Sequence, residues 1–190
     1  MKKYIVLLLS GMVVLNLHAQ EETPVDGKTT KKLTKEQKIE QRKADEEATA
    51  KMVAWMVENR KFVLEADYLS NQTGERIMVN QNINFIMIDS LKITIQLASV
   101  SGIGGANGMG GITTDGMITK WEVHKIGKTK NNYAIHLVTM THIGTYDISI
   151  DVSPYANADA RISGNQMGKL NYHGRIVPIG QSRVYKGMSI

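Results

Sequence analysis

The histidine and acidic side chains between residues 133 and 152 have the types and spacing that come closest to a reactive site. If Gly144 begins a two-residue turn, His142 lies opposite Asp147, and with His136 on the same face a His/His/Asp metal site could form. Six residues of extended strand, however, separate the two histidines by about 20 Å, too far to share one ion. We therefore expect an exposed His142–Asp147 pair and no metal site.

A glycine-rich stretch at residues 101–116 is the second candidate, because glycines let backbone amides approach a phosphate. A phosphate-binding loop also needs a following helix and a lysine, whereas residues 112–116 lead into another strand. The stretch predicts a flexible connection. The alternative is a mobile flap over a pocket, with Ile103 and Met109 as its apolar contacts. No cofactor is expected.

Other catalytic arrangements find little support in the sequence. The carboxylates are dispersed, and no serine lies in a nucleophile-elbow pattern. The chain has no cysteine, which excludes disulfides, thiolate metal sites, a cysteine nucleophile and a lipid-anchored cysteine. We therefore name no catalytic residue and regard an enzyme as less favoured than a binding protein.

The N-terminus has the three-part layout of a secretory signal. Lys2 and Lys3 precede an apolar run at residues 4–14, and Ala19 offers a small residue before Gln20. The run is too short for a membrane anchor, and no later segment predicts a spanning helix. Cleavage near Ala19–Gln20 would remove two lysines and lower the net charge from +5 to +3. We expect a periplasmic or secreted protein without an integral membrane span, and no nucleic-acid partner.

A charged helix is expected between the signal and the remaining sequence. Residues 20–33 predict a flexible leader, and Thr34 with Gln37 fits a capping box that opens a helix over residues 34–60. One face of this helix carries a stripe of residues three or four apart: Ala44, Ala48, Met52, Trp55, Met56 and Asn59. We expect Met52 and Trp55 to pack on a β core, and binding of a partner by the helix is the alternative.

Residues 61–190 have the two-residue period of strands. About nine or ten strands with mostly short turns predict a mainly β, α+β protein, an antiparallel meander that forms either a barrel or a sandwich. The Gly144 turn predicts that Thr141 pairs with Ile148 and Leu137 with Val152 on the core side. The side occupied by Trp121 stays open because the preceding loop permits either register.

The order of several short motifs resembles a known family. Phe62-Val-Leu-Glu-Ala-Asp67 is followed by Asn84-Phe85, Ile95-Gln-Leu97, the Gly104 to Gly116 cluster, Tyr146-Asp-Ile-Ser-Ile150 and Tyr172-His-Gly174. Over roughly residues 51–186 this order is similar to a secreted bacterial family, domain of unknown function 4251. The resemblance implies a mainly β envelope protein of the Bacteroides group, and it implies no activity or catalytic residue.

Together these observations favour a non-catalytic binding module for a small apolar or glycan-like ligand or an envelope partner, placed in a barrel mouth or sandwich cleft. The alternatives are an envelope structural or interaction protein that uses its helix, and a hydrolase with an unrecognised site. The candidate ligand-binding residues are Phe85, Met87, Ile103, Met109, Trp121 and Tyr172.

Overall fold

The computed structural model describes residues 34–98, 111–127, 131–164 and 168–189. The predicted signal sequence and leader, and the predicted ligand contacts Ile103 and Met109, lie outside these residues. Within the described residues no helix is both long and apolar enough to cross a membrane.

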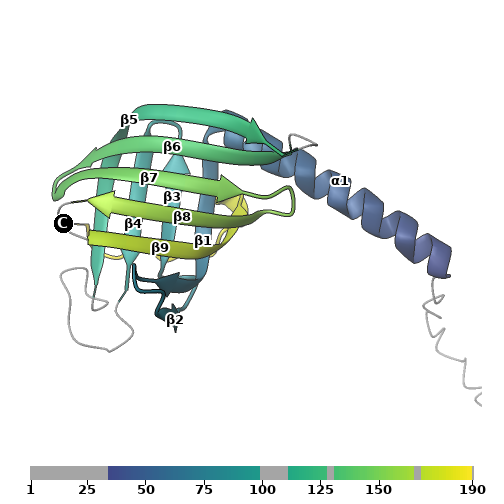
Figure 1. Cartoon of the computed structure of the whole chain (residues 1–190), viewed down its shortest axis with the longest axis horizontal. Helices are drawn as coiled ribbons and strands as arrows, with labels where there is room; N and C mark the ends of the chain where they lie inside the picture. Colours follow the sequence, from purple (N-terminus) through teal and green to yellow (C-terminus); the bar gives the residue numbers. More distant parts are fainter. Residues whose placement is uncertain (1–33, 99–110, 128–130, 165–167, 190) are drawn as a thin grey trace, which may run out of the picture. The chain divides into compact units, whose positions relative to one another are not determined.

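Eight antiparallel strands close into a barrel (Figure 1), which confirms the predicted meander and decides between barrel and sandwich. The chain runs up and down through neighbouring strands, and the last strand pairs with the first. A short additional strand, β2, extends one end of β1 as a hairpin. The strands are β1 (Lys61–Ser70), β2 (Arg76–Met78), β3 (Phe85–Asp89), β4 (Lys92–Leu97), β5 (Ile112–Ile126), β6 (Asn132–Thr141), β7 (Gly144–Val152), β8 (Asn157–Gly164) and β9 (Gly168–Val177).

Inward-pointing side chains fill the barrel with one apolar cluster, because alternate residues of each strand face the same side. On β6 and β7 the inward residues are Tyr133, Ile135, Leu137, Tyr146, Ile148, Ile150 and Val152. Trp121 lies directly opposite Leu137 and packs against this cluster. Trp121 is therefore on the inner side.

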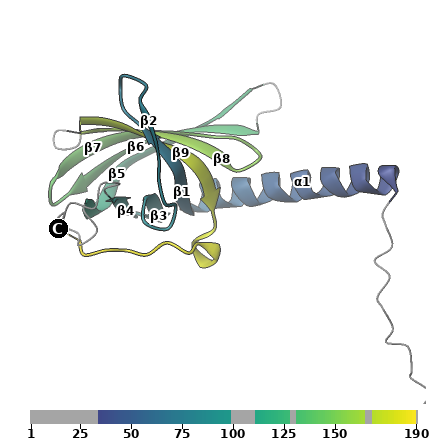
Figure 2. The ribbon, with the colours of Figure 1, turned by 90° about the horizontal axis from the view of Figure 1, so that it is seen from below.

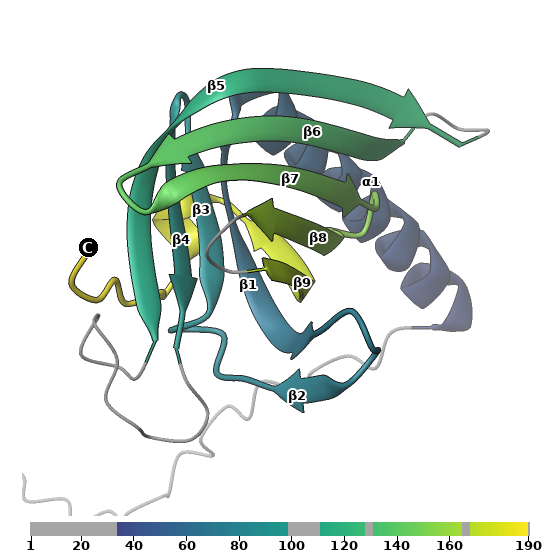
Figure 3. The same ribbon diagram turned by 60° about the vertical axis from the view of Figure 1, so that its left-hand side comes forward.

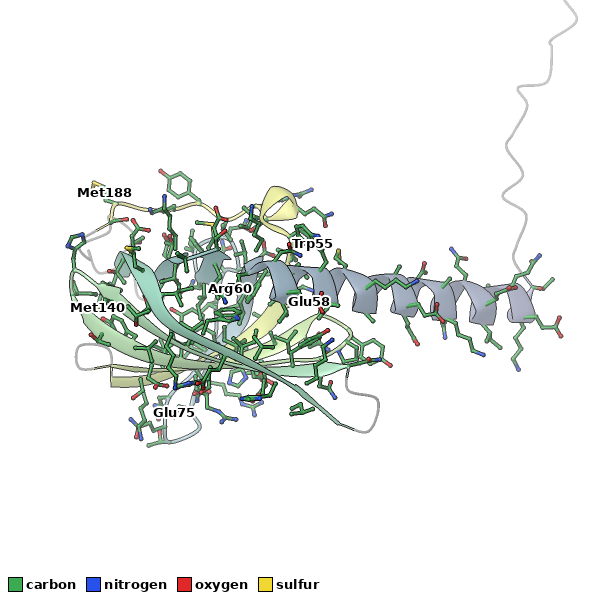
Figure 4. The ribbon with its side chains drawn as sticks, turned by 90° about the horizontal axis from the view of Figure 1, so that it is seen from above. Trp55, Glu58, Arg60, Glu75, Met140 and Met188 are labelled. Carbon is green, nitrogen blue, oxygen red and sulfur yellow. The ribbon has the colours of Figure 1, made fainter. Side chains whose placement is uncertain are left out.

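The last turns of helix α1 (Lys35–Asn59) complete the core. Val53, Met56 and Val57 are buried there, whereas residues 35–48 are all exposed. The expected packing of Trp55 is wrong, since its side chain is 52% exposed (Figure 4). The prediction that Met52 packs on the core is confirmed, and Met56 of the predicted stripe is fully buried. The contact face is shifted from the stripe toward Val53 and Val57, away from Trp55.

The β6–β7 hairpin has a different register from the predicted one. His142 and Ile143 form the turn, Thr141 pairs with Gly144, and Leu137 pairs with Ile148. Gly144 follows the turn with a φ of 141°, a conformation that favours glycine. The shift is an even number of residues, so the expected inner face of β7 is unchanged although its cross-strand partners are wrong.

After β9 the chain crosses the outer face of the barrel as a segment that we call the strap, residues 178–189 (Figure 2). It opens with the short helix η1 (Ile179–Gln181) and continues without further secondary structure. Ser182 donates a hydrogen bond to Glu65 of β1 at 2.6 Å, and the amide of Tyr185 donates to the carbonyl of Asn82 at 2.7 Å. The strap follows the last barrel strand and is thus fixed to the first strand, β1, and to the segment that precedes β3.

Gln96 is the main attachment point of the strap on β4. Its side chain is fully buried and donates to the carbonyls of Tyr185 at 2.8 Å and Ile83 at 3.1 Å. Its side-chain oxygen accepts from the amide of Gly187 at 2.8 Å and from the hydroxyl of Thr113 at 3.0 Å. A buried amide with all these partners satisfied holds the strap in one position.

Candidate functional site

A groove of about 640 Å³ lies on the outer side of the barrel beside the strap. We call it the methionine groove, after the thioether side chains of Met87, Met117 and Met140 that line it. Met117 and Met140 are 61% and 59% exposed and lie directly opposite each other on β5 and β6, so they form a small exposed apolar patch. The remaining lining residues are Asp89, Lys92, Ile93, Thr94, Asp115, Gly116, Thr141, His142 and Lys186.

Strand geometry explains why these residues meet. Met87 on β3, Thr94 on β4 and Asp115 on β5 occupy neighbouring outward positions in the ladder. Gly116 brings β5 close to β6, because a Cβ atom there would lie only 2.6 Å from the carbonyl oxygen of Met140. The close approach places the Met140 end of β6 beside the groove (Figure 4).

Asp115 forms the polar side of the groove next to the strap. Its carboxylate accepts hydrogen bonds from Lys186 at 2.6 Å, from Ser189 at 2.6 Å and from Thr94 at 2.6 Å. Burial favours the protonated form, but the bonds from Lys186, Ser189 and Thr94 outweigh it and lower the pKa of Asp115. Asp115 is thus ionised and paired with Lys186 at neutral pH.

The carboxylates and lysines of the groove are equal in number, and Asp89 is the cross-strand neighbour of Lys92. Asp89 lies 3.9 Å from Lys61, which does not line the groove, and Asp115 is neutralised by Lys186. Lys92 and His142 are exposed at the same groove. Apolar thioethers and a lysine therefore border one open space.

The structure separates the sequence-predicted ligand residues instead of bringing them together. Met87 lines the methionine groove. Phe85, two residues away, faces the same outer side but is fully buried. Tyr172 and Trp121 point into the barrel, where the Tyr172 hydroxyl donates to the carbonyl of Gln96 at 3.1 Å. Met87 and Phe85 thus lie on the outer side of the barrel wall, whereas Trp121 and Tyr172 lie on its inner side.

Trp121 has a charged neighbour that the sequence does not reveal. The guanidinium of Arg60 lies 5.2 Å from the centre of its ring, at the junction of α1 and β1 (Figure 4). Arg60 has a φ of 55°, which turns the chain sharply from the helix into the barrel. This stacking explains Trp121 as part of the closed end of the barrel.

The predicted His142–Asp147 pair is wrong, as the corrected register requires. Asp147 instead receives a 2.9 Å contact from Nε2 of His136, and Glu122 lies 3.6 Å from the other ring nitrogen. Among the described residues no group of three or more histidine and acidic side chains could hold a metal ion.

Sequence reasoning missed most residues of the methionine groove. Lys92, Met117, Met140 and Lys186 come from four segments, of which only the first three have strand periodicity. A usable signal existed in the outward positions of β4 and β5, where alternation predicts exposed residues. Apolar Met117 at such an outward position predicts an exposed thioether on the barrel surface.

Comparison with known proteins places the chain in a family. The model of the family "Domain of unknown function (DUF4251)" matches residues 26–176. The chain belongs to the DUF4251 family. This confirms the resemblance found in the sequence.

A solved structure supports the fold of this DUF4251 protein. The crystal structure of a DUF4251 family protein from Bacteroides eggerthii DSM 20697 is 23% identical, with a TM-score of 0.61. The match covers 73% of the present chain and 93% of the other chain. A search of curated proteins gives no match. At this identity the likeness shows a shared barrel and does not extend to a site.

Proposed function

We propose that this DUF4251 protein binds a small amphipathic ligand, with an apolar chain and an acidic head group, in the methionine groove. The single observation that carries the proposal is the exposure of Met117 and Met140 in a groove of about 640 Å³. Ligand pockets commonly have volumes of about 300–1,000 Å³ and a mostly apolar lining with a few polar groups.

The chemistry of the lining supports this ligand class. Methionine side chains are flexible and polarizable, so they adapt to apolar chains of different shape. Lys92 lies at the same groove, while its carboxylates Asp115 and Asp89 lie near Lys186 and Lys61. Lys92 is exposed and has no ion pair within 4 Å among the described residues, although Asp89 lies opposite it, so its ammonium group can pair with an acidic head group.

The predicted signal sequence suggests where binding would take place. Cleavage near Ala19 would release the barrel into the periplasm or outside the cell. We propose that the ligand is acquired there.

The test uses decanoate and the uncharged 1-decanol as a matched pair of probes in isothermal titration calorimetry. Decanoate is expected to bind more tightly than decanol by about fivefold, since an exposed ion pair contributes up to about 1 kcal/mol. The variant Lys92→Ala should remove this preference. Equal affinity of both probes for the unmodified protein would refute the acidic head group.

The apolar part is tested with the double variant Met117→Ser/Met140→Ser. Loss of this apolar contact is expected to raise the Kd for decanoate at least about tenfold. Met78 is the matched control, because it is 74% exposed on β2 and does not line the groove. Met78→Ser should leave the Kd unchanged. If Met78→Ser weakened binding as much as the double variant, the methionine groove would not be the site.

A further inference from the structure

A second cluster of polar side chains lies on the outer face of β1, β8 and β9, on strands that Figure 3 shows side by side. Nε2 of His173 lies 2.9 Å from the hydroxyl of Ser70. Nδ1 of the same ring lies 2.5 Å from a carboxylate oxygen of Asp159. None of the three residues lines the methionine groove.

The two hydrogen-bond partners of His173 indicate which tautomer its neutral ring adopts. An ionised carboxylate can only accept, so the ring nitrogen next to Asp159 must carry hydrogen. In the neutral ring Nε2 is then an acceptor that faces the Ser70 hydroxyl. This is the tautomer required of a general base that removes a proton from a serine.

Two further contacts hold the serine and the imidazole in place. Tyr68 stacks on the His173 ring with centroids 4.4 Å apart and planes 13° apart. The side-chain amide of Asn171 donates to Ser70 Oγ at 3.2 Å. Ser70 thus donates toward His173 and accepts from Asn171, so the hydrogen bonds of the network run in one consistent direction.

We infer that Ser70, His173 and Asp159 form an acyl-transfer site in which Ser70 is the nucleophile. His173 is the general base and Asp159 orients it. The Asn171 amide donates to Ser70 Oγ in this structure, and it would have to turn to the carbonyl oxygen of the substrate to stabilise the charge that develops there. Neither the family nor the methionine groove accounts for this arrangement.

The reaction balances with water as the only co-reactant. Ser70 Oγ bonds to the carbonyl carbon of an ester while its proton passes to Nε2 of His173. The bond from that carbon to the leaving oxygen then breaks, and Nε2 returns the proton to the leaving alcohol. Water attacks the acyl-serine, gives a proton to Nε2, and releases the acid as Ser70 Oγ recovers that proton.

A groove of about 270 Å³ reaches this cluster through Asn171, the residue that donates to Ser70 Oγ. Ser70 is only 7% exposed, and Ser70, His173 and Asp159 do not themselves line the groove. Asn171 lines it together with the cationic side chains of Arg161 and Lys169. Asp147 also lines it but is engaged by His136. A substrate carboxylate in this groove would lie near Lys169 and Arg161, in competition with the 3.7 Å ion pair between Arg161 and Asp151, and the ester would approach Ser70 from the side of Asn171.

The test is labelling of the full signal-free chain with a fluorophosphonate probe, located by peptide mass spectrometry. The adduct is expected on Ser70, and Ser70→Ala should abolish it. His173→Gln and Asp159→Asn should slow labelling by about a hundredfold, because a positioned general base contributes that much or more. Their thermal unfolding is measured alongside, so that only folded variants are compared.

His136 supplies a matched control, because among the described residues its side chain has two carboxylate partners and no hydrogen bond to a serine. His136→Gln should label at the unmodified rate. Hydrolysis of mono-4-nitrophenyl glutarate should exceed that of 4-nitrophenyl acetate, and Arg161→Ala should remove the difference. Absence of an adduct on Ser70, or equal labelling of folded His173→Gln, would overturn the acyl-transfer site. Equal hydrolysis of the two esters would overturn the assignment of an anionic substrate.

Discussion

Two parts of the barrel's outer surface have the same strand geometry and opposite surroundings. On β3, β4 and β5 the outward residues Phe85, Gln96 and Thr113 lie together in neighbouring register positions next to the strap and are fully buried. On β7 and β8 the outward residues Asp147, Asp159 and Arg161 are exposed. We call these the covered face and the open face.

The difference teaches that strand alternation decides which side a residue faces but not whether it is buried. Gln96 and Arg161 are both outward, yet Gln96 makes four hydrogen bonds inside protein and Arg161 makes a loose 3.7 Å ion pair with Asp151. Polar side chains such as Gln96 therefore stabilise the covered face through buried bonds, whereas the exposed ion pairs of the open face contribute little to stability.

The largest effect is expected from Gln96→Met, which keeps the volume of the side chain but removes its hydrogen bonds. The carbonyls of Ile83 and Tyr185 and the amide of Gly187 would lose a buried partner. We expect the free energy of unfolding to fall by about 3 kcal/mol, measured by urea denaturation.

Ser163→Ala is the control on the open face, because Ser163 is an exposed residue of β8. Its expected effect is within about 0.5 kcal/mol. Similar losses in the two variants would contradict the distinction between the covered and open faces.

A smaller, pH-dependent effect is expected from Asp115→Asn. The folded pKa of Asp115 is lowered, so its ionised form stabilises the protein above the ordinary value of 3.8, and this contribution is lost as the pH falls through the folded value. We expect the variant to be less stable by about 1 kcal/mol at pH 7, since the group is 43% exposed. The difference should disappear in denaturation curves recorded well below pH 3.8. A difference that persists unchanged in acid would exclude the ion pair as its cause.

The comparison of faces also explains how much of the fold the sequence predicts. Alternation on Ile148, Ile150 and Val152 predicts the core side of β7 correctly, because apolar period is a local property. The predicted cross-strand partners of β6 and β7 are wrong because the turn residues decide the register, and the turn is formed by His142 and Ile143. The strap has no apolar period at all, so burial of Gln96 beneath it depends on contacts far along the chain.

The candidate sites are harder to predict than the fold for the same reason. Met87 was among the predicted residues, but its groove neighbours Met117 and Lys186 join it only through the closed sheet and the strap. Ser70 and His173 are 103 residues apart in sequence and become neighbours because β9 pairs with β1. No local spacing encodes barrel closure.

The smallest effects are expected from two tyrosines inside the barrel. Tyr172, whose hydroxyl bonds to the carbonyl of Gln96, lies behind the covered face, and Tyr146 on β7 lies behind the open face with no partner for its hydroxyl among the described residues. Burial raises the pKa of both phenols, so both are neutral at ordinary pH.

Tyr172→Phe removes a satisfied bond, whereas Tyr146→Phe removes a buried oxygen that has no bond to lose. We expect Tyr172→Phe to lower the free energy of unfolding by about 1 kcal/mol, and Tyr146→Phe to leave it unchanged or raise it by up to about 1 kcal/mol. Urea denaturation of the two variants measures the pair under identical conditions. Because each substitution deletes the same single atom from a fully buried ring, volume and apolar area cancel between them. A clear loss in Tyr146→Phe would show that its hydroxyl has a partner, such as a buried water, and that the barrel interior is polar behind the open face as well.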